Sequence, residues 1–261
     1  MLATEREEFI RKKIISKGIV YVTDLVKELN VTSPTIRNDL DKLVKKYDDL
    51  DRIHGGVIYK KTEEEKTLTE VITGYSERSF ENIQLKKAIA RKSLDLIEDG
   101  DTLLLDSSST CFELASILSE TEKRVTIITN GLSTGTVLKQ NPKLTVIMIG
   151  GMLKPGSNTI YDEFNSPIYT MFNIDKYFFS ASGLSIKSGF SEFNIMEVKN
   201  KKANVENSRI AIALIDSTKF DKDSTSTFCS LKNIDYLISD YKLTAEQQKN
   251  YSKNTNLLIG K

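Results

Sequence analysis

Five segments that each follow an apolar stretch carry hydroxyl, amide or lysine side chains, which are groups that bind anions. They are "DSSST", "TNG", "GGMLKPG", "SASGLS" and "DSTKF". Their candidate ligand-binding residues are Asp106, Ser107, Ser108, Ser109, Thr110, Thr129, Asn130, Gly150, Gly151, Lys154, Ser182, Gly183 and Lys219. Hydroxyls and exposed backbone N–H groups donate hydrogen bonds to phosphate oxygens, and a lysine supplies the opposite charge. This combination predicts an anionic, polyhydroxylated ligand such as a phosphorylated sugar.

Each of these segments alone also fits a purely structural role. A Ser/Thr cluster before a helix is an ordinary N-cap, Gly-Gly after a strand is an ordinary turn, and "DSTK" is an ordinary loop with a solvated lysine. Five segments of one chemistry in succession favour a ligand site instead. The sequence has neither a Walker A pattern nor a G-x-G-x-x-G opening a first helix. ATP and dinucleotides are therefore not expected, and no cofactor is predicted.

Composition excludes further classes of protein. The 261 residues include one histidine, His54, and two cysteines, too few for a His-rich or four-cysteine metal site or a disulfide framework, so no metal is predicted. Because 37 basic residues face 36 acidic ones, nucleic-acid binding would need a local surface. No stretch reaches the roughly 18 apolar residues that cross a bilayer, and charged residues follow Met1. We expect a cytoplasmic protein without a membrane partner.

The candidate segments lie in a long region where apolar, β-prone runs alternate with helical patterns. A helix is expected over residues 77–98. The β-prone runs are "TLLLD", "RVTIITN", "LTVIMIGG", "KYFFSASG", "RIAIALID" and "YLISD". Near-continuous apolar strands separated by helices predict an α/β fold whose mostly parallel sheet is covered on both faces. Ligands bind such sheets beyond the carboxyl ends of the strands, which is where the candidate segments fall.

The first sixty residues predict a helix-turn-helix. One helix is expected over residues 5–16, and two more start near Thr23 and Thr32, joined only by Asn30 and Val31. In such a pair the second helix enters the DNA major groove. The candidate DNA-binding residues are Thr23, Thr32, Ser33, Thr35, Arg37, Asn38 and Lys42. Arginine and asparagine suit guanine and adenine edges, and a hydroxyl near the helix start suits phosphate.

Two further β-prone segments, residues 50–53 and 57–59, flank a Gly-Gly turn and predict a β-wing. Arg52 and His54 near its tip are expected to contact the DNA backbone or minor groove. A helical hairpin alone is often plain scaffold, but helix, helix pair and wing in succession predict double-stranded operator DNA as a partner. Residues 60–76 are charged and lack a sustained period. The expected domains are a winged helix-turn-helix domain (1–59), a linker (60–76) and an effector-binding α/β sensor domain (77–261).

The segments "VTSPTIRNDL" and "RIHGGV" resemble the DNA-binding domain of DeoR-family bacterial transcriptional regulators. The segments "LIEDGDTLLLDSSST", "TIITNGL", "IGG", "SASGLSIKSG" and "LIDSTKF" resemble that family's effector-binding domain, in order and spacing, so the resemblance covers nearly the whole chain. The sequence departs from the family at Asn38, where a second arginine is usual, and at "DSSST" and "SASGL", where D-S-G-T-T and G-A-x-G-I are frequent. The resemblance implies a repressor of carbohydrate metabolism that responds to a phosphorylated sugar, and we expect a homo-oligomer because paired DNA half-sites match protein symmetry.

That effector-binding domain is similar in turn to ribose-5-phosphate isomerase. By this resemblance, Lys86 in "LKKAIA" and the hydroxyls of "DSSST" hold a phosphate, while Glu197, with Glu192 close by, and Lys219 stand near the isomerase's catalytic glutamate and later lysine. The isomerase has a G-A-D-E loop whose carboxylates orient the open-chain sugar, and the matching "SASGLS" has none. We therefore expect binding without turnover and no catalytic residue. An isomerase with an accessory DNA-binding domain and a larger domain that only dimerises are the alternatives.

Overall fold

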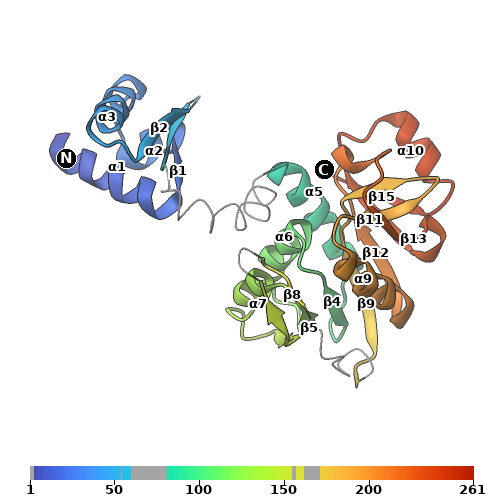
Figure 1. The fold of residues 1–261 in the computed structure, drawn as a ribbon. Coiled ribbons are helices and arrows are strands. Elements are labelled where there is room, and N and C mark those ends of the chain that lie inside the picture. The colour runs from blue at the N-terminus through green and yellow to red at the C-terminus, as the bar shows by residue number, and fades with distance from the viewer. Residues whose placement is uncertain (1–2, 54, 60–80, 155–156, 162–170) are drawn as a thin grey trace. The chain divides into compact units, whose positions relative to one another are not determined.

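The chain forms two compact units in the computed structural model, Met1–Glu70 and Val71–Lys261, and each is described by itself (Figure 1). The structure describes residues 3–53, 55–59, 81–154, 157–161 and 171–261. The predicted linker, 60–76, lies outside these ranges, and so does His54. Within the described ranges, no helix is both long and apolar enough to cross a bilayer, and no group of three or more His, Cys, Asp or Glu side chains is placed to hold a metal ion.

The smaller unit is a winged helix-turn-helix, as predicted. Its elements are α1 (Ala3–Lys17), β1 (Ile19–Tyr21), α2 (Val22–Leu29), α3 (Ser33–Lys46), β2 (Leu50–Ile53) and β3 (Gly56–Tyr59). The strands form an antiparallel sheet in the order β1-β3-β2, of which β1 was not expected. The tight turn between α2 and α3 uses Asn30, whose backbone is left-handed (φ 53°), a conformation that asparagine tolerates better than most residues.

Two of the expected helix starts differ in detail. The second helix begins at Val22, so Thr23 lies inside its first turn and does not cap it. Thr32 does occupy the N-cap of α3, but its side chain caps no backbone N–H; its hydroxyl lies 2.9 Å from that of Thr35. Pro34 stands in the first turn of α3, where its fixed φ and missing N–H cost nothing.

Apolar residues at helical spacing make the core of this unit. Ile10 and Ile14 of α1 pack with Ile36, Leu40 and Leu43 of α3, all of them 2% exposed or less. The Gly-Gly turn of the wing has a separate reason for each glycine. Gly55 has φ 81°, and a Cβ on Gly56 would lie 2.2 Å from the carbonyl oxygen of Val20, so a side chain would displace β3 from β1.

The larger unit is built on one parallel sheet of seven strands in the order β15-β14-β12-β9-β4-β5-β6. These strands are β4 (Thr102–Leu105), β5 (Thr126–Thr129), β6 (Thr145–Met148), β9 (Ile174–Phe179), β12 (Ser208–Leu214), β14 (Tyr236–Asp240) and β15 (Asn256–Gly260). From β4 the chain first adds β5 and β6 on one side and then adds β9 on the other. The strand order therefore reverses between β4 and β9, and a crevice forms at such a point beyond the carboxyl ends.

Smaller elements and helices complete this unit. The helices are α5 (Ile83–Ser93), α6 (Ser109–Leu118), α7 (Leu132–Leu138), α9 (Ile195–Asn207) and α10 (Ala245–Tyr251), with single 3-10 turns η1 (Leu94–Leu96), η2 (Ser217–Lys219) and η3 (Leu231–Asn233). A three-stranded antiparallel sheet contains β10 (Gly183–Ser185), β11 (Gly189–Glu192) and β13 (Ser226–Cys229), and a two-stranded one contains β7 (Met152–Leu153) and β8 (Ile160–Tyr161). The helix expected over 77–98 is shorter, because α5 gives way to η1 at Leu94.

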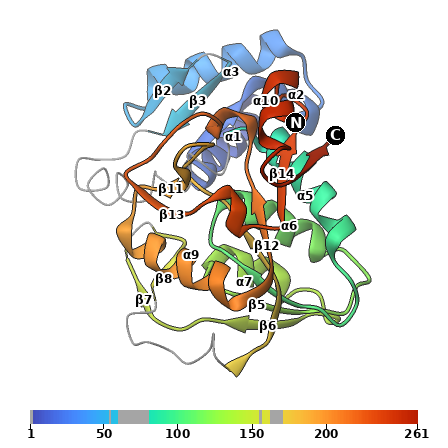
Figure 2. The same cartoon turned by 90° about the vertical axis from the view of Figure 1, so that its right-hand side faces the viewer.

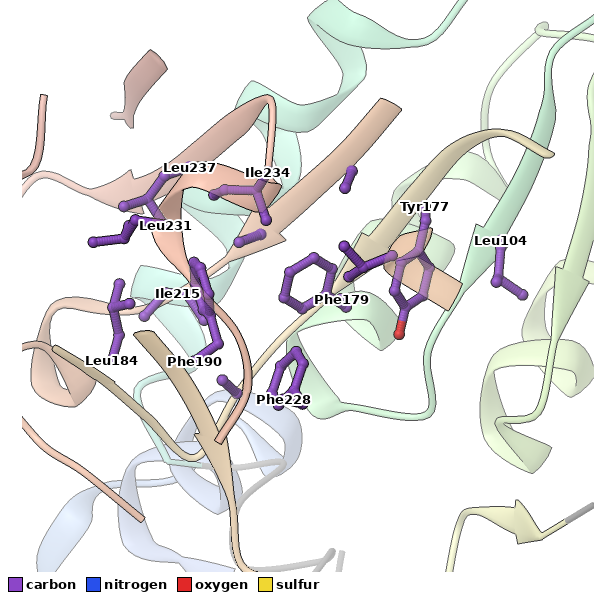
Figure 3. Close-up of a cluster of buried hydrophobic side chains, with 14 of the residues drawn as sticks. Leu104, Tyr177, Phe179, Leu184, Phe190, Ile215, Phe228, Leu231, Ile234 and Leu237 are labelled. Atoms are coloured by element: carbon purple, nitrogen blue, oxygen red, sulfur yellow. The ribbon is translucent and has the colours of Figure 1, made fainter. Parts of the chain in front are cut away.

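Both faces of the seven-stranded sheet are buried, which confirms the predicted α/β class. Helices α6 and α7 lie on one side of the sheet and α9 on the other (Figure 2). Alternate residues of β4 serve opposite faces: Leu103 and Leu105 join the core under α5, α6 and α7, and Leu104 joins the core on the other face. That second core contains a group of aromatic rings (Figure 3). Tyr177 stacks on Phe179 with ring centroids 5.1 Å apart, and Phe179 meets the edge of Phe228. Tight packing on both faces fixes the strand ends that carry the polar segments.

Candidate functional site

A cavity of about 140 Å³ lies at the carboxyl ends of β4, β9 and β12, at the reversal of strand order. The loop after β4 contributes residues 107–109, the loop after β9 contributes 180–182, and η2 after β12 contributes Thr218 and Lys219. The start of α5 and the segment around Glu192 complete the wall. Parallel strands deliver all these loops to one edge of the sheet, so residues more than a hundred positions apart share one cavity.

Two lysines give the cavity cationic character. Lys86 on α5 is 3% exposed, and burial together with the nearby charge of Lys219 lowers its pKa to about 8. Burial also lowers the pKa of Lys219, whose ammonium lies 3.2 Å from the hydroxyl of Ser180 and 3.8 Å from a carboxylate oxygen of Asp216. Two ammonium groups held together with little water gain from an anion placed between them.

Hydroxyls and a helix start lie on a second wall. Ser107 shares a 2.7 Å hydrogen bond with the hydroxyl of Thr159. Ser108 caps α6 by accepting from the backbone N–H of Cys111 at 3.2 Å, and Ser109 is the first helical residue. All three serines line the cavity, so the partial positive charge of the α6 N-terminus acts on the same space as the lysines.

A buried ion cluster forms the third wall, where Glu192 and Lys201 line the cavity and Asp106 lies behind them. Burial alone would lower the pKa of Lys201, but the carboxylates of Glu192, at 2.5 Å, and Asp106, at 3.2 Å, raise it well above its ordinary value. Burial opposes the ionisation of Asp106, yet the charge of Lys201, a side-chain hydrogen bond from Ser108 and the backbone N–H of Ser180 keep its pKa below the ordinary value. The cluster ties α9 to the ends of β4, β9 and β11.

Acidic side chains reach the cavity from segments other than "SASGLS". That loop has no carboxylate, but its Ser182 donates a hydrogen bond to Glu192. Glu81, Glu192, Glu197 and Asp216 all line the cavity. The loop alone therefore does not describe the charge of the pocket, where acidic side chains lie beside lysines: Glu192 is 2.5 Å from Lys201, and Asp216 is 3.8 Å from Lys219. Carboxylates of this kind accept hydrogen bonds from sugar hydroxyls.

The structure brings together some of the predicted ligand-binding residues and not others. Lining the cavity are Lys86, Ser107, Ser108, Ser109, Ser182, Glu197 and Lys219. Not lining it are Asp106, Thr110, Thr129, Asn130, Gly150, Gly151, Lys154 and Gly183. The second group has structural roles or faces solvent, for reasons that follow from the sheet order and the packing.

Position in the sheet explains half of the predicted residues that do not line the cavity. Gly150, Gly151 and Lys154 follow β6, an edge strand two places from β4, and all three are exposed; the Lys154 ammonium lies over the ring of Tyr161 at 4.9 Å. Asn130, after β5, donates to the carbonyl of Ile160 at 3.3 Å and so holds the segment that carries Thr159.

Packing explains the remaining ones. Thr129 accepts from the N–H of Gly131 at 3.0 Å, and Thr110 is fully buried in α6. Gly183 opens β10, where a Cβ would lie 2.6 Å from the carbonyl oxygen of Lys222, so its glycine serves packing. Asp106 does not line the cavity, but its carboxylate pairs with the ammonium of Lys201, which does.

Several lining residues were not predicted. They are Glu81, Asn82, Thr159, Ser180, Ala181, Phe193, Lys201 and Thr218, together with Glu192, which had been noted only as a neighbour of Glu197, and Asp216, which begins the candidate segment "DSTKF". Thr218 and Asp216 belong to "DSTKF", which follows a β-prone run, so their position after a strand could have predicted them. No sequence pattern pointed to Thr159. It reaches the cavity because its neighbour Asn158 accepts from the N–H of Ser133 at 2.7 Å and donates to the carbonyl of Ser107 at 3.1 Å.

The candidate DNA-binding residues lie mainly on α3. Arg37 and Asn38 are exposed on its outer face, and Lys42 lies 3.8 Å from Glu7. Arg52 of the wing bonds Asp41 at 2.7 Å and the carbonyl of Gly56 at 2.9 Å, so it links the wing to α3. Thr32, Ser33 and Thr35 lie together at the start of α3, as expected of phosphate-binding residues.

Two solved structures are similar in fold to part of this chain. Ribose 5-phosphate isomerase A from Methanocaldococcus jannaschii is 17% identical with a TM-score of 0.40, covering 53% of this chain and 55% of that one. The eIF2B beta subunit from Chaetomium thermophilum is 15% identical with a TM-score of 0.43, covering 66% and 54%. The chain thus spans about half the length of the solved structures it matches.

Curated relatives match along nearly their whole length. The chain is 33% identical to the HTH-type transcriptional regulator GolR of Listeria innocua over 96% of both proteins, and 30% identical to the lactose phosphotransferase system repressor of Staphylococcus epidermidis over 94% and 95%. Residues 6–63 match the DeoR-like helix-turn-helix domain, and residues 81–241 match the DeoR C terminal sensor domain. The chain belongs to the DeoR family of helix-turn-helix transcriptional regulators.

Proposed function

We propose that this regulator binds operator DNA through its smaller unit, represses a carbohydrate-metabolism operon, and is controlled by a phosphorylated sugar bound in the cavity of its larger unit. It acts as a cytoplasmic homo-oligomer. Relatives named as the lactose phosphotransferase system repressor and the putative aga operon transcriptional repressor support the repressor role and the link to carbohydrate metabolism. The boundaries 1–59, 60–76 and 77–261 are part of the proposal.

The observation that carries the proposal is the chemistry of the cavity. Lys86, Lys219 and the start of α6 with its serines suit a phosphate group. The carboxylates of Glu192 and Glu197 suit hydroxyl groups. A phosphate monoester on a polyhydroxylated carbon chain satisfies both sides at once, whereas a nucleobase would find one aromatic side chain among the lining residues.

The position of the cavity in the chain suggests how binding reaches the DNA. Glu81 and Asn82 line it and directly follow residues 60–80, through which the chain passes from one unit to the other. Asn82 has left-handed backbone (φ 54°) at the N-cap of α5 and donates to the hydroxyl of Thr218 at 3.4 Å. A ligand that rearranges these contacts acts at the beginning of the larger unit. By linkage, DNA affinity changes by the ratio of the ligand's affinities for the two states.

Fluorescence anisotropy with the DNA upstream of the chain's own gene tests this function. We expect binding that weakens with rising salt and that, at one fixed salt concentration, weakens with one member of a panel of sugar phosphates. DNA affinity that no sugar phosphate alters would overturn the sensor role, and a larger domain that only dimerises would give that result.

The second candidate, a sugar-phosphate isomerase, has one observation in its favour. Glu197 and Lys219 line one cavity, and a carboxylate beside a bound sugar is what proton transfer between adjacent carbons requires. A coupled assay with ribose 5-phosphate and with hexose 6-phosphates separates the two. We expect no product above background, and turnover abolished by Glu197→Gln would establish the enzyme instead.

A further inference from the structure

Phe193 is an aromatic side chain left in the open beside a polar cavity. It follows β11, whose four residues are all buried, and it is itself 70% exposed. Among the described residues that line the cavity, only Ala181 and Phe193 are apolar. The nearby rings of the core, Phe190 and Phe228, are 0% and 4% exposed, so Phe193 is not part of the aromatic core beside it.

Its chain neighbour gives the ring a chemical context. Glu192, directly before Phe193, presents a carboxylate that already accepts from Lys201 and Ser182. An oxygen acceptor and a flat apolar surface thus stand side by side at the cavity. A sugar can contact both at once. Its hydroxyls, around the edge of the carbon frame, donate to the carboxylate, and its C–H groups form apolar faces that pack on the ring. The negative face of an aromatic ring attracts such C–H groups and removes apolar area from water.

We propose that Phe193 is the specificity-determining platform of the effector site, which stacks on the C–H face of the sugar and thereby separates a sugar phosphate from inorganic phosphate. This inference rests on the proposed function. The lysines and the start of α6 attract any phosphate, whereas Phe193 adds affinity only when the phosphate is attached to a sugar. Covering the ring with the sugar also gives this exposed side chain a partner.

The test compares Phe193→Ala with Ile195→Ala. Ile195 lies two residues further on, is 69% exposed and does not line the cavity, so it matches the change in exposed apolar surface. Dissociation constants are measured by calorimetry for inorganic phosphate and for glucose 6-phosphate, galactose 6-phosphate and ribose 5-phosphate. We expect Phe193→Ala to weaken the preferred sugar phosphate about tenfold, equivalent to 1.4 kcal/mol. Inorganic phosphate affinity, and both affinities of Ile195→Ala, should stay at the wild-type value.

The possible results separate this inference from the proposed function. If the wild type prefers a sugar phosphate and Phe193→Ala keeps that preference, the platform is wrong and the sensor function stands. If Phe193→Ala and Ile195→Ala weaken the sugar phosphate equally, the effect belongs to the exposed surface and the platform is again wrong. If the wild type binds no sugar phosphate better than inorganic phosphate, both the platform and the proposed function fail.

Discussion

The ammonium of Lys201 lies 2.5 Å from a carboxylate oxygen of Glu192, and both side chains are only 7% exposed. Asp106 approaches the same ammonium at 3.2 Å, and Lys201 also donates to the carbonyl of Ser180 at 2.7 Å. One buried cation therefore holds two buried carboxylates and a loop end. The ion pairs of Lys201 therefore fix the shape of the cavity wall that Glu192 and Lys201 line.

Lys201→Met should destabilise the larger unit strongly. It leaves Glu192 and Asp106 buried without their cation, and breaking such a pair costs about 3 to 5 kcal/mol. At 2–4 °C for each kcal/mol in a domain of this size, the melting temperature should fall by about 10 °C. Lys199→Met, at an exposed position of the same helix, is the matched control. Equal melting temperatures for the two variants would show that the cluster contributes no net stability.

The same cluster makes stability depend on acid. The pKa of Asp106 is lower in the folded chain than its ordinary value, so its contribution is present above that ordinary value and is lost as the pH falls below it. The wild type should therefore lose more stability than Asp106→Asn between pH 6 and pH 3, as followed by thermal denaturation. Parallel curves for the two proteins would contradict the assignment.

Affinity for a phosphate ester should fall as the pH rises through 8. Burial and Lys219 lower the pKa of Lys86 to about 8, and only its protonated form pairs with the anion. Above that pH the affinity should decrease by up to about tenfold per pH unit, the limit for one coupled proton. The second pKa of a phosphate ester is near 6, so about nine-tenths of it is doubly ionised at pH 7 and its charge is nearly constant between pH 7 and 9.5.

The measurement is a calorimetric titration at several pH values in that range, with Lys86→Met beside the wild type. The variant should bind more weakly at pH 7 and show a flatter profile, because it lacks the titrating group. A profile in Lys86→Met as steep as in the wild type would assign the pH dependence to another residue, with Lys219 the next to test.

Three lysines, Lys86, Lys219 and Lys154, show which part of the site the sequence predicts and which part it does not. Lys86 and Lys219 are 133 positions apart and line one cavity. Strand-end reasoning predicted Lys219, because parallel strands end at a common edge, whereas Lys86 was predicted only from the family resemblance. Lys154 satisfied the same pattern, but its strand lies at the edge of the sheet. Strand order decides which loops reach the crevice, and local periodicity does not contain that order.

The buried ion cluster escaped prediction for a different reason. Lys201 belongs to "KNKKA", which has the pattern of a solvated helix face, and its three lysines differ only in where the helix turns them. Lys201 is 6% exposed while Lys199 and Lys202 are exposed. The difference depends on packing α9 against β9 and β11, which is tertiary information. The edge strand β15 was missed as well, because its exposed first residue and short apolar run resemble a loop.

Ser109→Asp should abolish the response of DNA binding to the sugar phosphate. The new carboxylate enters the cavity at the start of α6 and repels a phosphate there, while an acidic residue in the first turn of a helix does not harm the helix itself. DNA affinity without ligand should be unchanged in the anisotropy assay. Ser252→Asp, exposed after α10, is the control and should respond like the wild type. Lys219→Ala should behave like Ser109→Asp, since it removes the countercharge, and a normal response in both variants would place the ligand elsewhere.

Arg37→Ala should weaken DNA binding and leave the larger unit untouched. Arg37 is exposed on the second helix of the helix-turn-helix, so its guanidinium is available to the major groove. If it reads a guanine, the loss should be about 1 to 3 kcal/mol on the preferred operator and should vanish when that one base pair is changed. If it contacts phosphate instead, binding should weaken equally on all sequences and the salt dependence should drop by about one ion.

Lys253→Ala, an exposed charge on the larger unit, controls for net charge and should bind DNA normally. Because Arg37 and the cavity lie in different units, the calorimetric affinity for the sugar phosphate should equal that of the wild type. A parallel loss of both affinities would contradict the assignment of DNA binding and effector binding to separate units.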